Sequence, residues 1–225
     1  MKVTWLGRVN YADALAMQER IVAEKLAVPE RDDELLLLEH EPVYTIGRTQ
    51  NQSSLMGGTH LPHPIIETNR GGQATYHGPG QLIGYPIIAL REGERDLHKY
   101  LRTLEERVIM VLAEFGVPGC RRELLTGVWV DRRKIASIGV GVRRWITMHG
   151  FALNVCGDLS PFHAITPCGI AGVEMTSIEL ETGNAIEVAE VASHAARLFN
   201  PQEWFSSGRE APAEQSAPAR SSTAA

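Results

Sequence analysis

Apolar residues in the middle of the chain recur at alternating spacings of three and four, which is the period of one face of an α-helix. The series consists of Leu97, Leu101, Leu104, Val108, Val111 and Phe115. Asp96 precedes the series and suits a helix start, whereas Gly116 follows it and suits a helix end. We therefore expect a helix over residues 96–115. Weaker patterns predict helices over residues 11–27 and 186–198.

Short apolar runs bounded by turn residues form a second pattern, which predicts β-strands. Such runs lie at residues 35–38, 43–46, 64–68 and 82–90. Further runs at residues 127–131, 134–142 and 145–155 are joined by tight connectors. Tight connectors favour antiparallel pairing, because parallel strands need long crossovers. The strands are grouped apart from the helices, so the sequence predicts an α+β fold with helices packed on a mostly antiparallel sheet.

The organisation of the chain follows from its length and from its last residues. With 225 residues, the chain is long enough for one large domain or two small ones. No linker divides residues 1–205, so we expect a single domain there. Residues 206–225 contain no large apolar side chain. Such a segment cannot bury enough surface to offset the entropy of ordering it, so we predict a disordered tail.

Charge and cysteine content argue against several classes of protein. The net charge of −5 is unlike that of a general nucleic-acid binder. No run of apolar residues is long enough to predict a membrane span, and the N-terminal residues do not resemble a secretory signal. The three cysteines are widely spaced and odd in number, which favours neither a disulfide framework nor a zinc site. We therefore expect a cytoplasmic protein without a bound metal.

The segment RGGQATYHGPGQ, at residues 70–81, is rich in glycine. It matches neither the phosphate-binding loop nor the dinucleotide-binding fingerprint. Its glycines allow a ligand to approach main-chain N–H groups, and Arg70 can hold an acidic group with two donors. His77 can act as a base near neutral pH or only as a hydrogen-bonding group. A plain turn between strands explains the same glycines, and the residues alone leave these alternatives open.

Cys168 lies between proline and glycine on a predicted loop, where a packed core residue is unexpected. A free thiol has a pKa near 8.5, so only about 3% of it is thiolate at pH 7 and a nearby cation is needed to raise that fraction. The candidate cations are His77, His149, His163 and Lys134. Lys134 begins an apolar run, but an ordinary edge-strand lysine has the same pattern. Spacing alone does not choose among these partners. Cys156, after an apolar run, better fits a buried inert cysteine.

Five blocks of sequence occur together in one order. They are RGGQATYHGPGQ, KIASIG at residues 134–139, HGFALNV at 149–155, DLSPF at 158–162 and TPCG at 166–169. Together they resemble the octanoyl-[acyl-carrier-protein]:protein N-octanoyltransferases, the lipoyl (octanoyl) transferases of lipoate biosynthesis. The likeness covers about residues 4–200. It implies the fold of the biotin- and lipoate-protein ligase catalytic domain, a mixed, largely antiparallel sheet flanked by helices.

The resemblance also implies an activity, its partners and a set of site residues. Members of this family transfer an octanoyl group from octanoyl-acyl carrier protein to a lysine of apo lipoyl domains, which occur in 2-oxoacid dehydrogenase E2 subunits and in the glycine cleavage H protein. No cofactor is needed. By this resemblance, Cys168 is the nucleophile that forms an acyl thioester, and Lys134 activates it. The implied substrate contacts are Arg70, Gly71, Gly72, Gln73, Ala74, Thr75, Tyr76, His77, Ser137, Ile138, Gly139, Gly150, Phe151 and Ala152.

The implied reaction has two steps, acylation of Cys168 and then attack by the acceptor lysine. Lys134 can serve in the second step as the base for the incoming amine. Small residues are expected to leave room for the C8 chain, namely Ala74, Gly150 and Ala152. Backbone N–H groups are candidates for holding the developing oxyanion, near Gly72, Gly139 or Gly169.

Four arginines in the two predicted turns have two interpretations. Arg132, Arg133, Arg143 and Arg144 can form a docking patch for an acidic carrier protein, or they are ordinary solvated turn residues. Two other functions also remain open. One is an ATP-dependent lipoate-protein ligase on the same fold, which needs no cysteine. The other is a non-catalytic module that only recognises lipoyl domains.

Overall fold

The computed structural model describes residues 1–49, 61–165 and 173–199. Its strands are β1 (Lys2–Val9), β2 (Glu34–His40), β3 (Val43–Ile46), β4 (Ile65–Glu67), β5 (Thr75–His77), β6 (Gln81–Ile87), β7 (Cys120–Arg122), β8 (Leu125–Val130), β9 (Arg133–Arg143) and β10 (Ile146–Asn154). Its helices are α1 (Tyr11–Ala27), α2 (Leu97–Glu114), α3 (Ile178–Thr182) and α4 (Val188–Leu198), with short 3-10 helices η1 (Glu92–Glu94) and η2 (Ser160–Ala164).

The strands form two sheets. The larger has seven strands in the order β1-β2-β6-β10-β9-β8-β7, and the smaller has three in the order β4-β3-β5. Strands β9 and β10 form a long antiparallel hairpin, and β10 continues antiparallel to β6. Two pairs, β1 with β2 and β3 with β4, are parallel. The sheets are therefore mixed and largely antiparallel, which confirms the predicted fold class.

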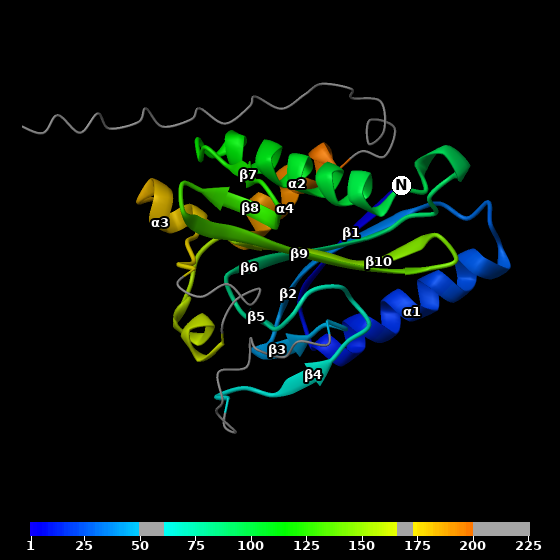
Figure 1. Cartoon of the computed structure of the whole chain (residues 1–225), viewed down its shortest axis with the longest axis horizontal. Helices are drawn as coiled ribbons and strands as arrows, with labels where there is room; N and C mark the ends of the chain where they lie inside the picture. The colour runs from blue at the N-terminus through cyan, green and yellow to red at the C-terminus, as the bar shows by residue number, and fades with distance from the viewer. Residues whose placement is uncertain (50–60, 166–172, 200–225) are drawn as a thin grey trace, which may run out of the picture.

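The large sheet is covered on both faces, with α1 on one side and α2 and α4 on the other (Figure 1). Strand β2 illustrates how its sequence fits this position. Successive side chains of a strand point to opposite faces. Leu35 and Leu37 accordingly pack in the cluster with α2 and α4, whereas Leu36 and Leu38 pack in the cluster with α1. A strand buried on both faces is apolar almost throughout and does not alternate.

The periodic elements lie where the sequence predicts them. Helix α2 begins after Asp96, whose carboxylate accepts the backbone N–H groups of His98 and Lys99. It is followed by Gly116 at φ +72°, a conformation that favours glycine. Helix α1 has its predicted bounds, and α4 begins two residues later than predicted. Each predicted strand is present, β3 with its predicted bounds and the others with ends shifted by up to three residues.

The sequence patterns missed β1, β5, β7 and α3. Strand β1 is an edge strand with one neighbour, and its Val3 and Trp5 side chains are exposed, so it shows no clean alternation. The other three have only three to five residues each, which is too short for a periodic pattern. The predicted tail over residues 206–225 lies outside the described residues. The single domain over 1–205 therefore stays a prediction.

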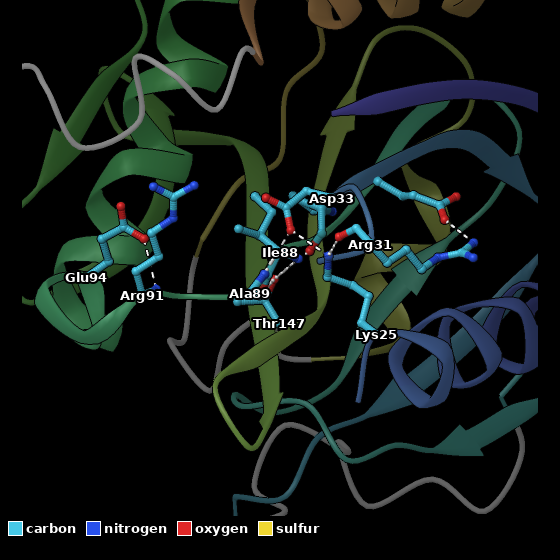
Figure 2. Close-up of polar contacts among 10 residues, drawn as sticks. Lys25, Arg31, Asp33, Ile88, Ala89, Arg91, Glu94 and Thr147 are labelled. Atoms are coloured by element: carbon cyan, nitrogen blue, oxygen red, sulfur yellow. Dashed lines mark hydrogen bonds and ion pairs between the residues drawn. The ribbon is translucent and has the colours of Figure 1, made fainter. Parts of the chain in front are cut away.

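An ion pair between a buried lysine and a half-buried aspartate fixes the connection between α1 and β2 (Figure 2). Lys25 Nζ lies 2.9 Å from Asp33 Oδ1 and donates to the Arg31 carbonyl at 2.7 Å. Asp33 Oδ1 also accepts the Ala89 N–H at 3.0 Å, just beyond the end of β6. One carboxylate thus ties α1 to two neighbouring strands. Among the residues that the structure describes, no helix is both long and apolar enough to span a membrane.

Candidate functional site

A cavity lies between the glycine-rich segment and the middle of the β9–β10 hairpin. We call it the central cavity, and it is lined by Tyr11, Arg70, Gly72, Gln73, Ala74, Thr75, His77, Tyr85, Ser137, Ile138, Gly139, His149, Gly150, Phe151 and Ala152. Counted out to its open mouth, it holds about 480 Å³ of empty space. This figure includes the solvent at the mouth, and the interior space open to a water-sized molecule is about 50 Å³.

The central cavity brings together almost all the substrate contacts implied by the resemblance. The exceptions are Gly71 and Tyr76. The Gly71 N–H donates to the Val140 carbonyl at 2.9 Å, so this residue anchors the segment to β9. The Tyr76 ring instead packs edge-on against Phe162 in the cluster under the small sheet. Neither residue lines the cavity.

Three lining residues were not among the predicted contacts, namely Tyr11, Tyr85 and His149. Tyr11 is the first residue of α1, and its ring stacks on His77 with the two ring planes 13° apart. Tyr85 lies on β6 and hydrogen-bonds His40. An aromatic residue at a helix start or in an apolar strand has no distinctive sequence signal, because either position also suits ordinary core packing.

Gly150 does not make room for a ligand in the way the sequence suggested. A Cβ atom at this position would lie 2.2 Å from the Gly84 carbonyl oxygen and 2.7 Å from Pro86 Cδ. The missing side chain therefore allows β6 to approach β10 closely and does not open the cavity. The backbone of Gly150 still forms part of the cavity wall.

A chain of side-chain hydrogen bonds begins at Arg70. Its guanidinium donates to Thr45 Oγ1 at 2.8 Å and to the Thr45 carbonyl at 2.7 Å. Thr45 Oγ1 lies 3.2 Å from His77 Nε2, and His77 Nδ1 lies 3.3 Å from Gln81 Oε1. The Gln81 oxygen only accepts, so His77 carries its proton on Nδ1 and its Nε2 accepts from the Thr45 hydroxyl. His77 is thus held as a neutral hydrogen-bonding group.

The same chain continues towards β9. Gln81 Nε2 donates to Asn154 Oδ1 at 3.0 Å, and Asn154 Nδ2 donates to the Thr176 carbonyl at 2.9 Å. The Thr176 N–H donates to the Lys134 carbonyl at 3.0 Å. From Arg70 to the Thr176 carbonyl, every donor points in the same direction, and hydrogen bonds in such a chain polarise one another. The wall of the central cavity is thereby connected to the backbone of Lys134.

Two buried histidines, His77 and His149, line the central cavity, and a third, His40, packs behind His77 and Tyr85. Burial lowers the pKa of His40 and of His149 from 6.5 to about 4. For His77, burial first, and then the nearby His40 and Arg70, lower the pKa well below 6.5. A buried imidazole loses more hydration when charged than when neutral. The three rings are therefore neutral at pH 7.

Lys134 is buried at the start of β9, with about 1% of its surface exposed. Its Nζ donates to the Thr126 carbonyl at 3.1 Å and lies 5.4 Å from the centre of the Trp129 ring. Its backbone N–H donates to the Glu174 carbonyl at 2.8 Å. Lys134 does not line the central cavity but precedes Ser137, which does, by three residues on the same strand.

Cys168 lies outside the described residues, as does Gly169. The pairing of Cys168 with Lys134 therefore stays a prediction. The described chain resumes at residue 173, and Glu174 and Thr176 hydrogen-bond the backbone of Lys134. Of the other cysteines, Cys120 is exposed, and the thiol of Cys156 has its pKa raised by burial and by Glu179. This agrees with an unreactive Cys156.

The four turn arginines do not form one patch, which corrects the expectation of a single docking surface. Arg132 and Arg133 lie at the start of β9, whereas Arg143 and Arg144 lie at its other end. Strand β9 has 11 residues, so the two pairs are about 33 Å apart at 3.3 Å per residue. Arg133 is moreover paired with Glu181 at 3.0 Å. Arg143 and Arg144 are exposed at the hairpin tip.

Side chains that could bind a metal ion do not gather in one place within the described residues. Across residues 1–49, 61–165 and 173–199, no group of three or more histidine, cysteine, aspartate or glutamate side chains is arranged to hold a metal ion. Arg70 and His77, which line the central cavity, are instead engaged in the hydrogen-bond chain described above.

Comparison with solved structures shows the fold. An archaeal bipartite lipoate protein ligase with its E2 lipoyl domain, from Thermoplasma acidophilum, gives a TM-score of 0.68 at 17% identity, covering 88% of this chain and 81% of that one. A lipoate-protein ligase A bound with ATP gives 0.70 at 18% identity, covering 88% and 84%. The biotin protein ligase of Aquifex aeolicus gives 0.51 at 14% identity, covering 88% and 67%.

Comparison with curated proteins finds relatives of higher sequence identity than these solved structures. The octanoyltransferase of Geobacter sulfurreducens is 50% identical over 199 residues, which cover 88% of this chain and 83% of that protein. The octanoyltransferase of Synechococcus elongatus is also 50% identical, over 202 residues covering 88% and 86%. The sequence pattern of the lipoyl protein ligase A/B catalytic domain matches residues 10–200. The chain therefore belongs to the lipoyl protein ligase A/B catalytic domain family.

Proposed function

We propose that this protein transfers an octanoyl group from octanoyl-acyl carrier protein, through a thioester on Cys168, to the acceptor lysine of apo lipoyl domains. The acceptors are those of 2-oxoacid dehydrogenase E2 subunits and of the glycine cleavage H protein. The observation that carries the proposal is the 50% identity, over 88% of this chain, to relatives named octanoyltransferase. The ligases among the solved structures are below 20% identity and support only the fold.

The first step is a thioester exchange. The Cys168 thiolate attacks the carbonyl carbon of the octanoyl thioester, and a new C–S bond forms. The old C–S bond breaks, and the carrier leaves as a thiol after taking a proton from the Lys134 ammonium, which becomes a neutral amine. Thioester exchange is nearly balanced in energy, so no ATP is required. The buried amino group of Lys134 supports this step, because an ammonium beside a thiol favours the thiolate. The backbone of Lys134 is paired with residues that follow Cys168 closely in sequence.

The second step makes the amide. The acceptor lysine attacks the acyl-enzyme as a neutral amine, the C–N bond forms, and the C–S bond to Cys168 breaks. One proton of the attacking amine must be removed, and Lys134 is the base we assign to it. Cys168 leaves as a thiolate beside the resulting Lys134 ammonium, so both groups return to their starting charges. An amide is more stable than a thioester, so this step drives the reaction forward.

We assign the acyl chain to the central cavity. Its walls include Ile138, Phe151 and Ala152, which offer apolar contact. Burying about seven methylene-sized groups at about 0.8 kcal/mol each contributes several kcal/mol to binding. Arg70 and His77 are then positioning groups, since their hydrogen bonds are made mainly within the protein.

One assay separates this function from its two rivals. Octanoyl-acyl carrier protein and an apo lipoyl domain are incubated with the protein, with and without ATP, and the lipoyl domain is weighed by intact-mass spectrometry. Octanoylation without ATP is the expected result, and Cys168→Ser is expected to abolish it. Product only with free octanoate and ATP would identify a ligase. Binding of the lipoyl domain with no product under either condition would identify a recognition module.

A further inference from the structure

Glu105 is a charged residue in the middle of α2 whose side chain is completely buried. Its Oε2 atom pairs with Arg102 at 2.7 Å and with Arg121 Nε at 3.3 Å. Its Oε1 atom accepts the backbone N–H of Gly127 at 2.9 Å. Burying a carboxylate is costly unless it is paired and hydrogen-bonded. The mechanism proposed above does not use this residue, so its position needs its own explanation.

The Gly127 N–H belongs to the same peptide group as the Thr126 carbonyl. That carbonyl is the one that accepts Lys134 Nζ at 3.1 Å. A carboxylate and an ammonium therefore bind the two ends of a single peptide group. The order is the Glu105 carboxylate, the N–H of Gly127, the carbonyl of Thr126 and the ammonium of Lys134.

This arrangement has an electrostatic consequence. A hydrogen bond from a peptide N–H to a charged acceptor is stronger than one to a neutral acceptor. Such a bond polarises the peptide and makes its carbonyl oxygen a better acceptor. The negative charge of Glu105 thus acts on Lys134 without direct contact.

Gly127 makes this arrangement sterically feasible. Its φ is +126°, a conformation that residues with a side chain rarely adopt. A Cβ atom there would lie 2.6 Å from the Ala136 carbonyl oxygen and 2.7 Å from Lys134 Cε. The lysine side chain therefore passes directly over the bare Cα of Gly127. The Lys134 side chain is therefore held by the bare Cα of Gly127 and by the Thr126–Gly127 peptide group, whose N–H is bound by the buried Glu105 carboxylate.

We propose that Glu105 is a positioning residue that fixes the orientation of Lys134 and strengthens its hydrogen bond through the Thr126–Gly127 peptide group during acyl transfer. The inference rests on the proposed function of Lys134. Arg102 and Arg121 hold the other carboxylate oxygen and keep Oε1 directed at Gly127. Glu105 touches no reacting atom in this account and acts only through Lys134.

The test is Glu105→Gln, which keeps the shape and the accepting oxygen but removes the charge. We expect kcat for octanoyl transfer to fall about 10-fold, because a hydrogen bond to a charged group is replaced by a neutral one. The KM for octanoyl-acyl carrier protein should stay within about twofold, since the cavity is untouched. The NMR resonances of the Gly127 amide proton and of Lys134 Nζ should both shift. Glu114→Gln is the matched control, because it removes the same charge from the exposed end of α2 and leaves the Gly127 bond in place, so kcat should not change.

A double-mutant cycle distinguishes this inference from the proposed function. If Lys134→Met retains turnover, the proposed role of Lys134 is wrong, and the inference falls with it. If Lys134→Met abolishes turnover but Glu105→Gln changes neither kcat nor the two resonances, the inference alone is overturned. On the Lys134→Met background, Glu105→Gln should cause no further loss of residual activity, because the two changes remove the same interaction.

A second measurement uses the unaltered protein, in case Glu105→Gln does not fold. Scalar couplings transmitted across hydrogen bonds can be sought in protein labelled with carbon-13 and nitrogen-15. We expect a coupling between the Gly127 amide nitrogen and the Glu105 carboxyl carbon, and another between Lys134 Nζ and the Thr126 carbonyl carbon. Absence of both couplings in a well-resolved spectrum would overturn the inference.

Discussion

Mild acid should destabilise this protein before its carboxylates are protonated, because buried neutral histidines must take up protons on unfolding. The pKa of His40 and that of His149 are about 4 in the folded protein and 6.5 when exposed. Between these values the unfolded chain binds more protons than the native one. The free energy of unfolding is therefore highest above pH 6.5 and falls as the pH drops from 6.5 towards 4.

The size of the effect follows from the two pKa values. A difference of this size corresponds to about 3 kcal/mol for each histidine over the whole window. Integrated only down to pH 5, the loss is about 2 kcal/mol for each, or about 4 kcal/mol for the pair. His77 adds to the loss in the same direction, because its pKa is also lowered. Hydrogen bonds from Ser160 lower the pKa of Asp158 below its usual 3.8, so this carboxylate affects stability only near and below pH 4, outside this window.

Urea unfolding at pH 7.5 and at pH 5.0 measures the difference directly. We expect a loss of at least about 4 kcal/mol in the wild-type protein, with an unchanged denaturant slope. His149→Asn should reduce that loss by about 2 kcal/mol, and asparagine tolerates the positive φ of 57° at this position. His98→Asn, which replaces an exposed histidine, is the control. A wild-type loss below about 1 kcal/mol would refute the reasoning.

Three further predictions concern the ion pair, the histidine of the cavity and the hairpin tip. Asp33→Asn should lower the free energy of unfolding, measured in urea, by about 3 kcal/mol, and Lys25→Met should lower it by less. The reason is that the lysine side chain is 1% exposed and the aspartate 27%, so a lysine left without its partner is the more deeply buried charge. His77→Ala should raise the KM for octanoyl-acyl carrier protein in steady-state assays yet still allow the acyl-enzyme to form. Reversing the charges of Arg143 and Arg144 to glutamate should raise that same KM at low salt, because an acidic carrier is then repelled.

Each of these has a control. Equal losses of unfolding free energy in Asp33→Asn and Lys25→Met would show that the burial of the remaining charge does not determine which variant is less stable. Complete loss of the acyl-enzyme in His77→Ala would mean that this residue takes part in the chemistry. Arg132→Glu, at the far end of β9, tests whether any added negative charge has the same effect on KM. An unchanged KM for octanoyl-acyl carrier protein in the hairpin variant would show that Arg143 and Arg144 are ordinary turn residues.

Local patterns predicted the regular elements because those elements are long and buried on a defined face. Helix α2 has both a cap and a regular apolar stripe, and β2 is apolar almost throughout. The same apolar stripe also contains Glu105, and its position there could have predicted that this residue is buried. This residue lies four after Leu101 and three before Val108, so it occupies the apolar face. A charged residue at such a position is either buried or misaligned, and the structure shows that it is buried.

The remainder of the site depends on pairings that local patterns do not contain. Strand β10 lies between β6 and β9, and this order brings Gln81 within reach of Asn154, 73 residues away. Thr45 connects Arg70 to His77 only because β3 pairs with β5. Threonine, glutamine and asparagine are common in strands and turns, so their identities alone indicated no role. The resemblance located most of the cavity wall, and the three-dimensional register explains how that wall is held.

The most direct test of the central claim is the mass of the protein after brief mixing with octanoyl-acyl carrier protein, without ATP and without a lipoyl domain. We predict a mass increase of one octanoyl group, lost on treatment with hydroxylamine and assigned to Cys168 by peptide sequencing. Adding an apo lipoyl domain should discharge it and place the same mass on the acceptor. An unmodified protein that nevertheless octanoylates the lipoyl domain, or an adduct on another residue, would contradict the account.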